Sequence, residues 1–272
     1  MHDYFFKRMT LKQLSQKYGY SREWIQAKIH RFTPQLHETT PKHTTVVIDA
    51  SFFGKRKDKL GLIVAKDVHA SLPIAYNFIE TENKEVYIDL MKQMISKGYS
   101  VDAVVLDGKP GIFDLFGDIP VQMCHFHMKA IITRKLTKHP KLQASIELKR
   151  IVAYLGKISE CRFAYMLHAW HKRHEAFLNE KAEDDSKRGW HYKHRRVRSA
   201  YGSLMRFLPY LYTYRRYPCL HIPNTTNALD GGCFSPLKEL LKVHRGIDKK
   251  MKQKLIVYFL ENRKIQPPEI PL

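Results

Sequence analysis

Four short apolar runs between residues 46 and 106 predict β-strands, and one longer segment among them predicts a helix. The runs are 46–48, 61–65, 72–76 and 101–106, and apolar positions recur at helical spacing over 83–97. Pro73 suits only an edge strand or the start of a strand, and Gly98 ends the helix. Three strands, a helix and a further strand predict an α/β fold, with a mixed sheet covered by helices.

Residues 10–32 have the pattern of a helix-turn-helix. Thr10 and Gln13 have capping-box spacing, Gly19 permits a turn, and Ser21 can cap a second helix. On that helix, the exposed face would present Arg22, Gln26 and Lys28 to a DNA groove. A plain helical hairpin has the same pattern, so DNA binding here is one of two interpretations.

From residue 128 to 217 the pattern is helical, with one long amphipathic helix predicted over 163–178. A compact pattern returns after Pro218. Ser235 and Pro236 predict the start of a helix, and a last helix is expected over 248–263.

The chain is strongly basic: 47 Lys and Arg against 26 Asp and Glu give it a net charge of +21. Residues 129–217 hold 21 basic against 7 acidic residues, a field that favours a polyanion such as DNA. The densest stretch, 187–198, mixes basic and aromatic side chains. Its expected DNA contacts are Lys187, Arg188, Trp190, Lys193, Arg195, Arg196 and Arg198. A solvated helical face or an acidic protein partner are the alternatives.

The same sequence argues against membrane insertion and secretion. No window holds 18 uninterrupted apolar residues, and the first residues lack a charged stretch followed by an apolar one. The four cysteines are widely scattered, which is not typical of a disulfide framework and favours a reducing cytoplasm.

Three aspartates are the candidate chemical groups. Asp49 and Asp107 each follow an apolar run, and ligands gather at the carboxyl ends of strands in α/β sheets. Paired carboxylates favour Mg²⁺ or Mn²⁺. The alternative is that both cap ordinary turns. Asp230 is the third candidate, although it also fits an acidic residue in the first turn of a helix capped by Asn227. Glu239 is a fallback carboxylate.

Cys124 and His127 form a Cys-x-x-His motif. Such spacing can bind zinc, but a tetrahedral zinc site needs four ligands and no second compact pair is obvious. A packed, hydrogen-bonded structural element is therefore the favoured interpretation.

From about residue 40 to 262 the chain resembles bacterial insertion-sequence transposases of the mutator-like superfamily. The resemblance rests on the order and spacing of five segments, 47–53, 106–108, 122–127, 190–198 and 225–246. It implies an RNase H-like fold and an acidic catalytic triad of Asp49, Asp107 and Asp230 that binds Mg²⁺ or Mn²⁺. The third position is most often Glu in that family. Cys124 and His127 match its Cys-x-x-His signature.

The resemblance also implies a domain plan. It predicts a catalytic core in two parts, 43–127 and 218–272, separated by a basic helical insertion over 128–217. The helix-turn-helix pattern predicts a DNA-binding region over 1–40, which agrees with recognition of element ends. The expected function is binding of element ends, metal-dependent strand cleavage and 3′-hydroxyl transfer. The expected partners are the terminal inverted repeats, target DNA and a second copy or more of the chain. A structure-specific nuclease and an inactive DNA-binding regulator are the alternatives.

Overall fold

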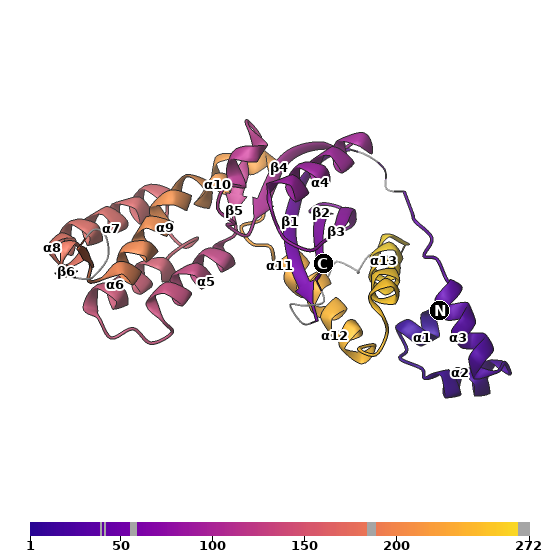
Figure 1. Cartoon of the computed structure of the whole chain (residues 1–272). Helices are drawn as coiled ribbons and strands as arrows, with labels where there is room; N and C mark the ends of the chain where they lie inside the picture. The colour runs from indigo at the N-terminus through magenta and orange to yellow at the C-terminus, as the bar shows by residue number, and fades with distance from the viewer. Residues whose placement is uncertain (39, 41, 55–58, 184–188, 266–272) are drawn as a thin grey trace. The chain divides into compact units, whose positions relative to one another are not determined.

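The structure is a computed structural model that describes residues 1–38, 40, 42–54, 59–183 and 189–265 (Figure 1). The chain divides into two compact units. Unit 1 comprises 1–101 and 227–272, and unit 2 comprises 102–226. The described helices include none that is both long and apolar enough to cross a membrane.

A mixed five-stranded sheet confirms the α/β prediction, and its order is β3-β2-β1-β4-β5. β1 (His43–Phe53), β2 (Leu60–Asp67) and β3 (Pro73–Ile79) form an antiparallel meander, in which Asp49 lies opposite Val64. β4 (Ser100–Leu106) and β5 (Val121–Met123) are parallel. Pro73 begins an edge strand, as expected, because an edge tolerates a missing backbone donor. β5 was not predicted, since a three-residue strand has no detectable period.

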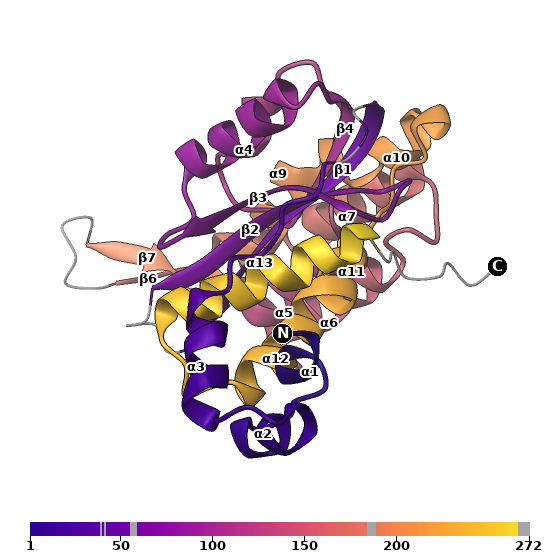
Figure 2. The ribbon, with the colours of Figure 1, turned by 90° about the vertical axis from the view of Figure 1, so that its right-hand side faces the viewer.

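Helices cover both faces of the β1–β3 meander in unit 1. α4 (Lys84–Ser96) is capped by Asn83, whose side chain accepts the Val86 N–H at 3.1 Å, and it buries Leu90 and Met94. α13 (Lys249–Ile265) lies on the other side of the strands (Figure 2). The sheet is therefore enclosed, which explains why every residue of β2 is buried.

Three N-terminal helices pack on the C-terminal part of unit 1. They are α1 (His2–Phe5), α2 (Leu11–Tyr18) and α3 (Arg22–Arg31). The caps follow the sequence prediction: Thr10 and Gln13 form a reciprocal capping box, Gly19 has a φ of 74°, and the Ser21 side chain accepts the Trp24 N–H. Rings join this group to α13, with Phe6 stacked on Tyr258 at 5.3 Å. Whether the two helices act as a DNA-reading motif stays a prediction.

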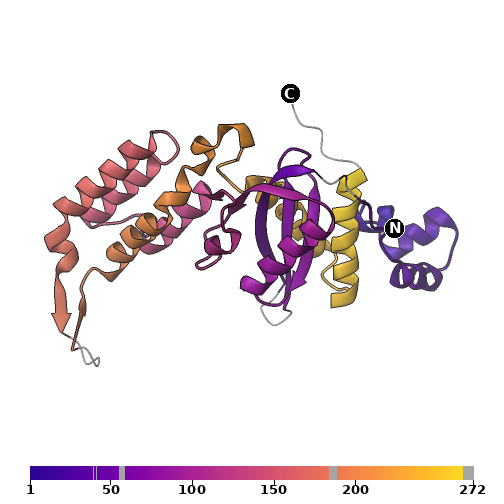
Figure 3. The same ribbon diagram turned by 90° about the horizontal axis from the view of Figure 1, so that it is seen from above.

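Unit 2 is mostly helical (Figure 3). Its helices are α5 (His125–Leu136), α6 (Gln143–Ala153), α7 (Glu160–Arg173), α8 (Glu175–Asn179), α9 (Arg195–Leu211) and α10 (Thr213–Arg216), with short turns η2 (Phe113–Phe116) and η3 (Pro218–Leu220). The hairpin strands are β6 (Lys181–Glu183) and β7 (Trp190–Tyr192). The single helix expected over 163–178 is wrong, because the chain breaks at His174. His174 has a non-helical backbone between α7 and α8, and its Nε2 lies 2.9 Å from the Glu147 carboxylate on α6.

The segment before the last two helices also differs from expectation. α11 (Asn227–Leu229) leads into a π-helical turn, η4 (Asp230–Phe234), and then into α12 (Ser235–Val243). The prediction that Ser235 and Pro236 start a helix is confirmed, since α12 begins at Ser235, but the π-turn directly before it was not predicted. A π-turn has one more residue per hydrogen-bonded ring than an α-turn, and sequence patterns do not mark it.

Candidate functional site

The side chains of Asp49 and Asp230 come together within unit 1. A carboxylate oxygen of Asp49 lies within 4.8 Å of one from Asp230, although the two residues lie near opposite ends of the chain. Asp49 is buried in β1, with its Oδ1 accepting the Ala50 N–H at 2.7 Å, and Asp230 is half-buried. Two carboxylates at this separation repel each other unless a cation or a proton joins them.

The π-turn η4 positions Asp230 as its first residue. π-turns are rare and occur frequently at functional sites. A buried lysine contacts this segment: Lys66 on β2 donates from Nζ to the carbonyl oxygen of Ala228 at 3.2 Å. Burial lowers the pKa of the Lys66 amine. The sequence analysis missed Lys66, since a lysine in an apolar strand has no motif to mark it.

Cys124, His127 and Thr226 form a hydrogen-bonded group within unit 2. The Thr226 N–H donates to the Cys124 Sγ at 3.3 Å, and its hydroxyl lies 3.3 Å from His127 Nδ1. Burial by itself raises the pKa of the Cys124 thiol, but hydrogen bonds from His127 and Thr226 outweigh it and leave the pKa below its ordinary value. Among the described residues, no cluster of three potential metal ligands includes Cys124. The geometry favours the structural interpretation of this cysteine over zinc binding.

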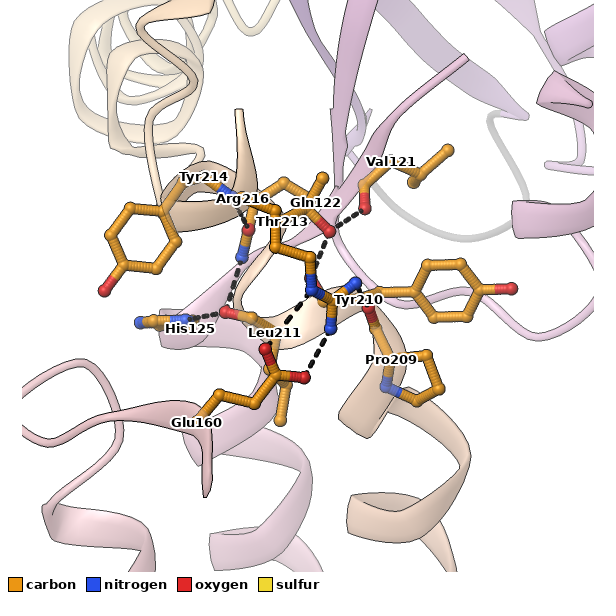
Figure 4. Close-up of polar contacts among 10 residues, drawn as sticks. All are labelled: Val121, Gln122, His125, Glu160, Pro209, Tyr210, Leu211, Thr213, Tyr214 and Arg216. Atoms are coloured by element: carbon orange, nitrogen blue, oxygen red, sulfur yellow. Dashed lines mark hydrogen bonds and ion pairs between the residues drawn. The ribbon is translucent and has the colours of Figure 1, made fainter. Parts of the chain in front are cut away.

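A buried polar network holds the Cys-x-x-His segment against the end of α9 (Figure 4). Gln122 is fully buried, donates to the Leu211 carbonyl oxygen at 3.1 Å and accepts the Tyr214 N–H at 3.0 Å. His125 Nε2 contacts the same Leu211 oxygen at 2.7 Å. Thr213 donates to the carbonyl oxygen of Val121 at 2.7 Å. These bonds fix where β5 ends and α5 begins.

Asp107 follows β4 and belongs to unit 2. Its Oδ1 accepts the Lys109 N–H at 3.2 Å. Gly108, with a φ of 94°, lets the chain pass Met123 of β5, since a Cβ there would lie 2.3 Å from the Met123 Cε. Asp107 is thus fixed within its own unit, and its convergence with Asp49 and Asp230 stays a prediction.

The pair of Asp49 and Asp230 suits a hard divalent cation. Carboxylate oxygens are the ligands that Mg²⁺ and Mn²⁺ prefer, and a cation would offset the repulsion between the two side chains. The donor set therefore fits the predicted metal. Asp49 lies inside β1 and not at its end, so the expected strand-end position of Asp49 is wrong, and so is the alternative that it caps a turn.

The basic residues predicted to contact DNA differ in their surroundings. Arg195 and Arg196 are exposed in the first turn of α9, and Lys193 is exposed in an ion pair with Glu180. Arg198, in contrast, is committed within unit 2: it lies 3.6 Å from the Tyr192 ring centroid and donates to the Leu178 carbonyl oxygen at 2.8 Å.

The remaining predicted DNA contacts lie on β7, on α3 or outside the described residues. Trp190 is covered by the amine of Lys181 at 4.0 Å, and Lys187 and Arg188 lie outside the described residues. On α3, Arg22 and Gln26 are exposed, and the Lys28 amine lies 5.2 Å from the Trp24 ring.

The chain matches no protein-family model, and no curated protein matches it either.

Proposed function

We propose that the protein is a DNA transposase of the acidic-residue, divalent-metal type, built on an RNase H-like core. The observation that carries the proposal is the approach of Asp49 and Asp230 to within 4.8 Å in unit 1. A central strand and a helical turn distant in sequence each supply one carboxylate. This is the arrangement that the resemblance to insertion-sequence transposases implies.

In this proposal Asp49 and Asp230 would hold Mg²⁺ or Mn²⁺, and the bound ion would supply an activated water and charge stabilisation for the leaving 3′ oxygen of a phosphodiester. The protein side chains orient the ions and need no general base of their own. The freed 3′-hydroxyl then attacks a second phosphodiester in the same type of in-line displacement.

Asp107 is the further carboxylate expected at this site, and Cys124 and His127 are the structural signature expected near it. Asp107 follows β4, the neighbour of β1 in the strand order. His127 is bonded to Thr226, which directly precedes α11 and lies four positions before Asp230. That Asp107 acts with the aspartate pair is part of the proposal and rests on the resemblance.

Net charge supports DNA as the substrate. The excess of basic residues would release counterions from phosphates, and exposed Arg195 and Arg196 are suited to such contacts. We expect a homodimer or larger assembly on paired element ends, acting at the bacterial nucleoid.

The test uses the DNA that flanks the coding region as a labelled substrate, with the full-length protein and Mg²⁺. Wild type should cut at the element end and join the 3′-hydroxyl to a target fragment, and EDTA should stop both reactions. Asp49→Asn should abolish cutting while leaving DNA binding unchanged or slightly tighter. The matched control is Asp89→Asn, at an exposed site on α4, and it should cut as wild type does.

The outcomes separate the alternatives. Cutting without joining would assign the protein to structure-specific nucleases. Binding with no cutting by wild type would assign it to regulators. Normal cutting by Asp49→Asn would overturn the catalytic assignment.

A further inference from the structure

A cavity of about 670 Å³ lies in unit 1 at the end of β1, between the strands and helices α12 and α13. Its apolar lining includes Phe52, Leu60 and Leu241. The volume is in the range of small-ligand sites. The cavity does not include Asp49 or Asp230, so it is separate from the proposed metal site.

Cations dominate the rim of the cavity. Five basic residues line it against one acid, Asp248, which is already used because its Oδ1 accepts the Met251 N–H at 2.8 Å. Lys249 pairs with Glu80 at 3.7 Å. The other four cations make no ion pair with any acid that the structure describes; they are Lys238, Lys242, Arg245 and Lys252. An anionic ligand would complement them.

An aromatic ring stands exposed beside these cations. Phe52 is 48% exposed, an unusual position for a phenylalanine on a strand. Gly61 lies opposite it on β2, and a Cβ at Gly61 would lie 2.7 Å from the Phe52 ring. The missing side chain at position 61 therefore gives the Phe52 ring room to lie over Gly61, with about half of its surface in solvent.

We infer that this cavity binds an unpaired nucleotide of the DNA substrate, with the base against Phe52 and the flanking phosphates on the lysine and arginine side chains. A base inside a duplex is stacked on both faces, so only an unpaired nucleotide offers a free face to the ring. Aromatic stacking combined with a basic surface is the usual way in which proteins hold single strands. An acidic peptide would satisfy the cations but would leave the Phe52 ring without a partner.

The inference rests on the proposed function, since it requires that the protein acts on DNA. Phe52 follows Asp49 by three residues on the same strand, a distance of about 10 Å at the rise of a β-strand. Because an odd spacing along a strand directs the two side chains to opposite faces of the sheet, a DNA strand that contacts both must pass the end of β1, where the cavity lies. The cavity would hold a nucleotide next to the scissile phosphate while cleavage proceeds at the aspartate pair.

The experiment compares a blunt duplex with the same duplex carrying an overhang of unpaired thymidines. Affinities are measured with the full-length protein in EDTA, so that no cutting occurs. Wild type should bind the overhang duplex roughly tenfold more tightly. Phe52→Ala should lose that gain without changing blunt-duplex affinity, and Phe52→Tyr should keep it. Thermal unfolding of each variant checks that it is folded.

Charge reversal tests the rim. The double variant Lys242→Glu with Arg245→Glu should also lose the overhang gain. Lys250→Glu, an exposed lysine on α13 that does not line the cavity, is the matched control and should keep it. Photo-cross-linking from 5-iodouracil in the overhang should label the peptide that contains Phe52.

Three results would overturn the inference. The first is equal binding of the overhang duplex by Phe52→Ala and wild type. The second is cross-linking confined to 189–198. The third is competition by a poly-glutamate peptide for the cavity with no competition by the overhang, which would assign it to an acidic protein segment. Failure of wild type to bind even the blunt duplex would instead defeat the proposed function, and this inference with it.

Discussion

The buried Lys66 amine donates a hydrogen bond of 3.2 Å to the carbonyl oxygen of Ala228, two residues before Asp230. The bond joins the second strand of the sheet to the helical segment that carries one of the paired carboxylates. Burial lowers the pKa of Lys66, because the apolar surroundings destabilise the charged form of the amine. A costly group at this position is typical of a functional site.

Lys66→Met should weaken metal-dependent cutting about tenfold, because it releases the segment before Asp230. It should change the free energy of unfolding by less than about 1 kcal/mol, since an apolar side chain of similar length replaces a costly buried amine. Urea denaturation and cutting rates at varied Mg²⁺ measure the two effects. Lys97→Met is the control, because its amine donates to the Ile74 carbonyl oxygen at 2.8 Å outside the site. Equal cutting by the Lys66 variant and wild type would contradict the positioning role.

Gln122→Leu should lower the free energy of unfolding by about 2–4 kcal/mol. The substitution leaves the Tyr214 N–H without its acceptor and removes one of the two bonds to the buried Leu211 carbonyl oxygen, which keeps its contact with His125 (Figure 4). Urea denaturation measures the loss. Gln143→Leu removes an exposed bond of 2.9 Å to Glu147 and should cost less than about 0.5 kcal/mol. Similar costs for the two variants would show that the network contributes little.

Stability should fall as the pH drops below 6.5, in part through His125. Burial lowers the pKa of this imidazole from its ordinary value of 6.5, so the unfolded state binds more protons just below that pH. The contribution of His125 to the free energy of unfolding is fully present above pH 6.5. It is lost as the pH falls from 6.5 through the lower pKa that this imidazole has in the folded protein. Urea midpoints at pH 7.5 and 5.0 measure the fall, to which His244, also with a lowered pKa, adds. His125→Asn should reduce the pH dependence; an unchanged slope would argue against the assignment.

Substitutions of the basic residues on α9 should affect either DNA binding or stability. Arg195→Ala and Arg196→Ala should each lower the slope of log K against log salt for DNA binding by about 0.9, through loss of a phosphate contact. Arg198→Ala should mainly lower stability, by about 1–2 kcal/mol, because it loses its contacts with Tyr192 and Leu178. Binding isotherms from 50 to 200 mM salt and urea denaturation distinguish them. A flat salt dependence in wild type would exclude phosphate contacts altogether.

Local patterns in the sequence were sufficient to predict much of the fold. The alternating and continuous apolar runs predicted β1 to β4, and the capping residues Thr10 and Ser21 predicted where two helices begin. These features depend on residues that are close together in the sequence, so they can be recognised without a structure. Asp49 and Asp230 were candidates because an acid beside an apolar segment is visible without a structure.

Only the tertiary structure decided which side chains meet. Nothing in the order of residues indicates that Lys66 reaches Ala228, that Arg198 turns inward to Tyr192, or that Gly61 leaves room for the ring of Phe52. The π-turn at Asp230 is equally absent from the pattern, because no sequence period marks a single π-turn. Contacts between distant segments arise from burial and chain closure, and a linear pattern does not record either of them.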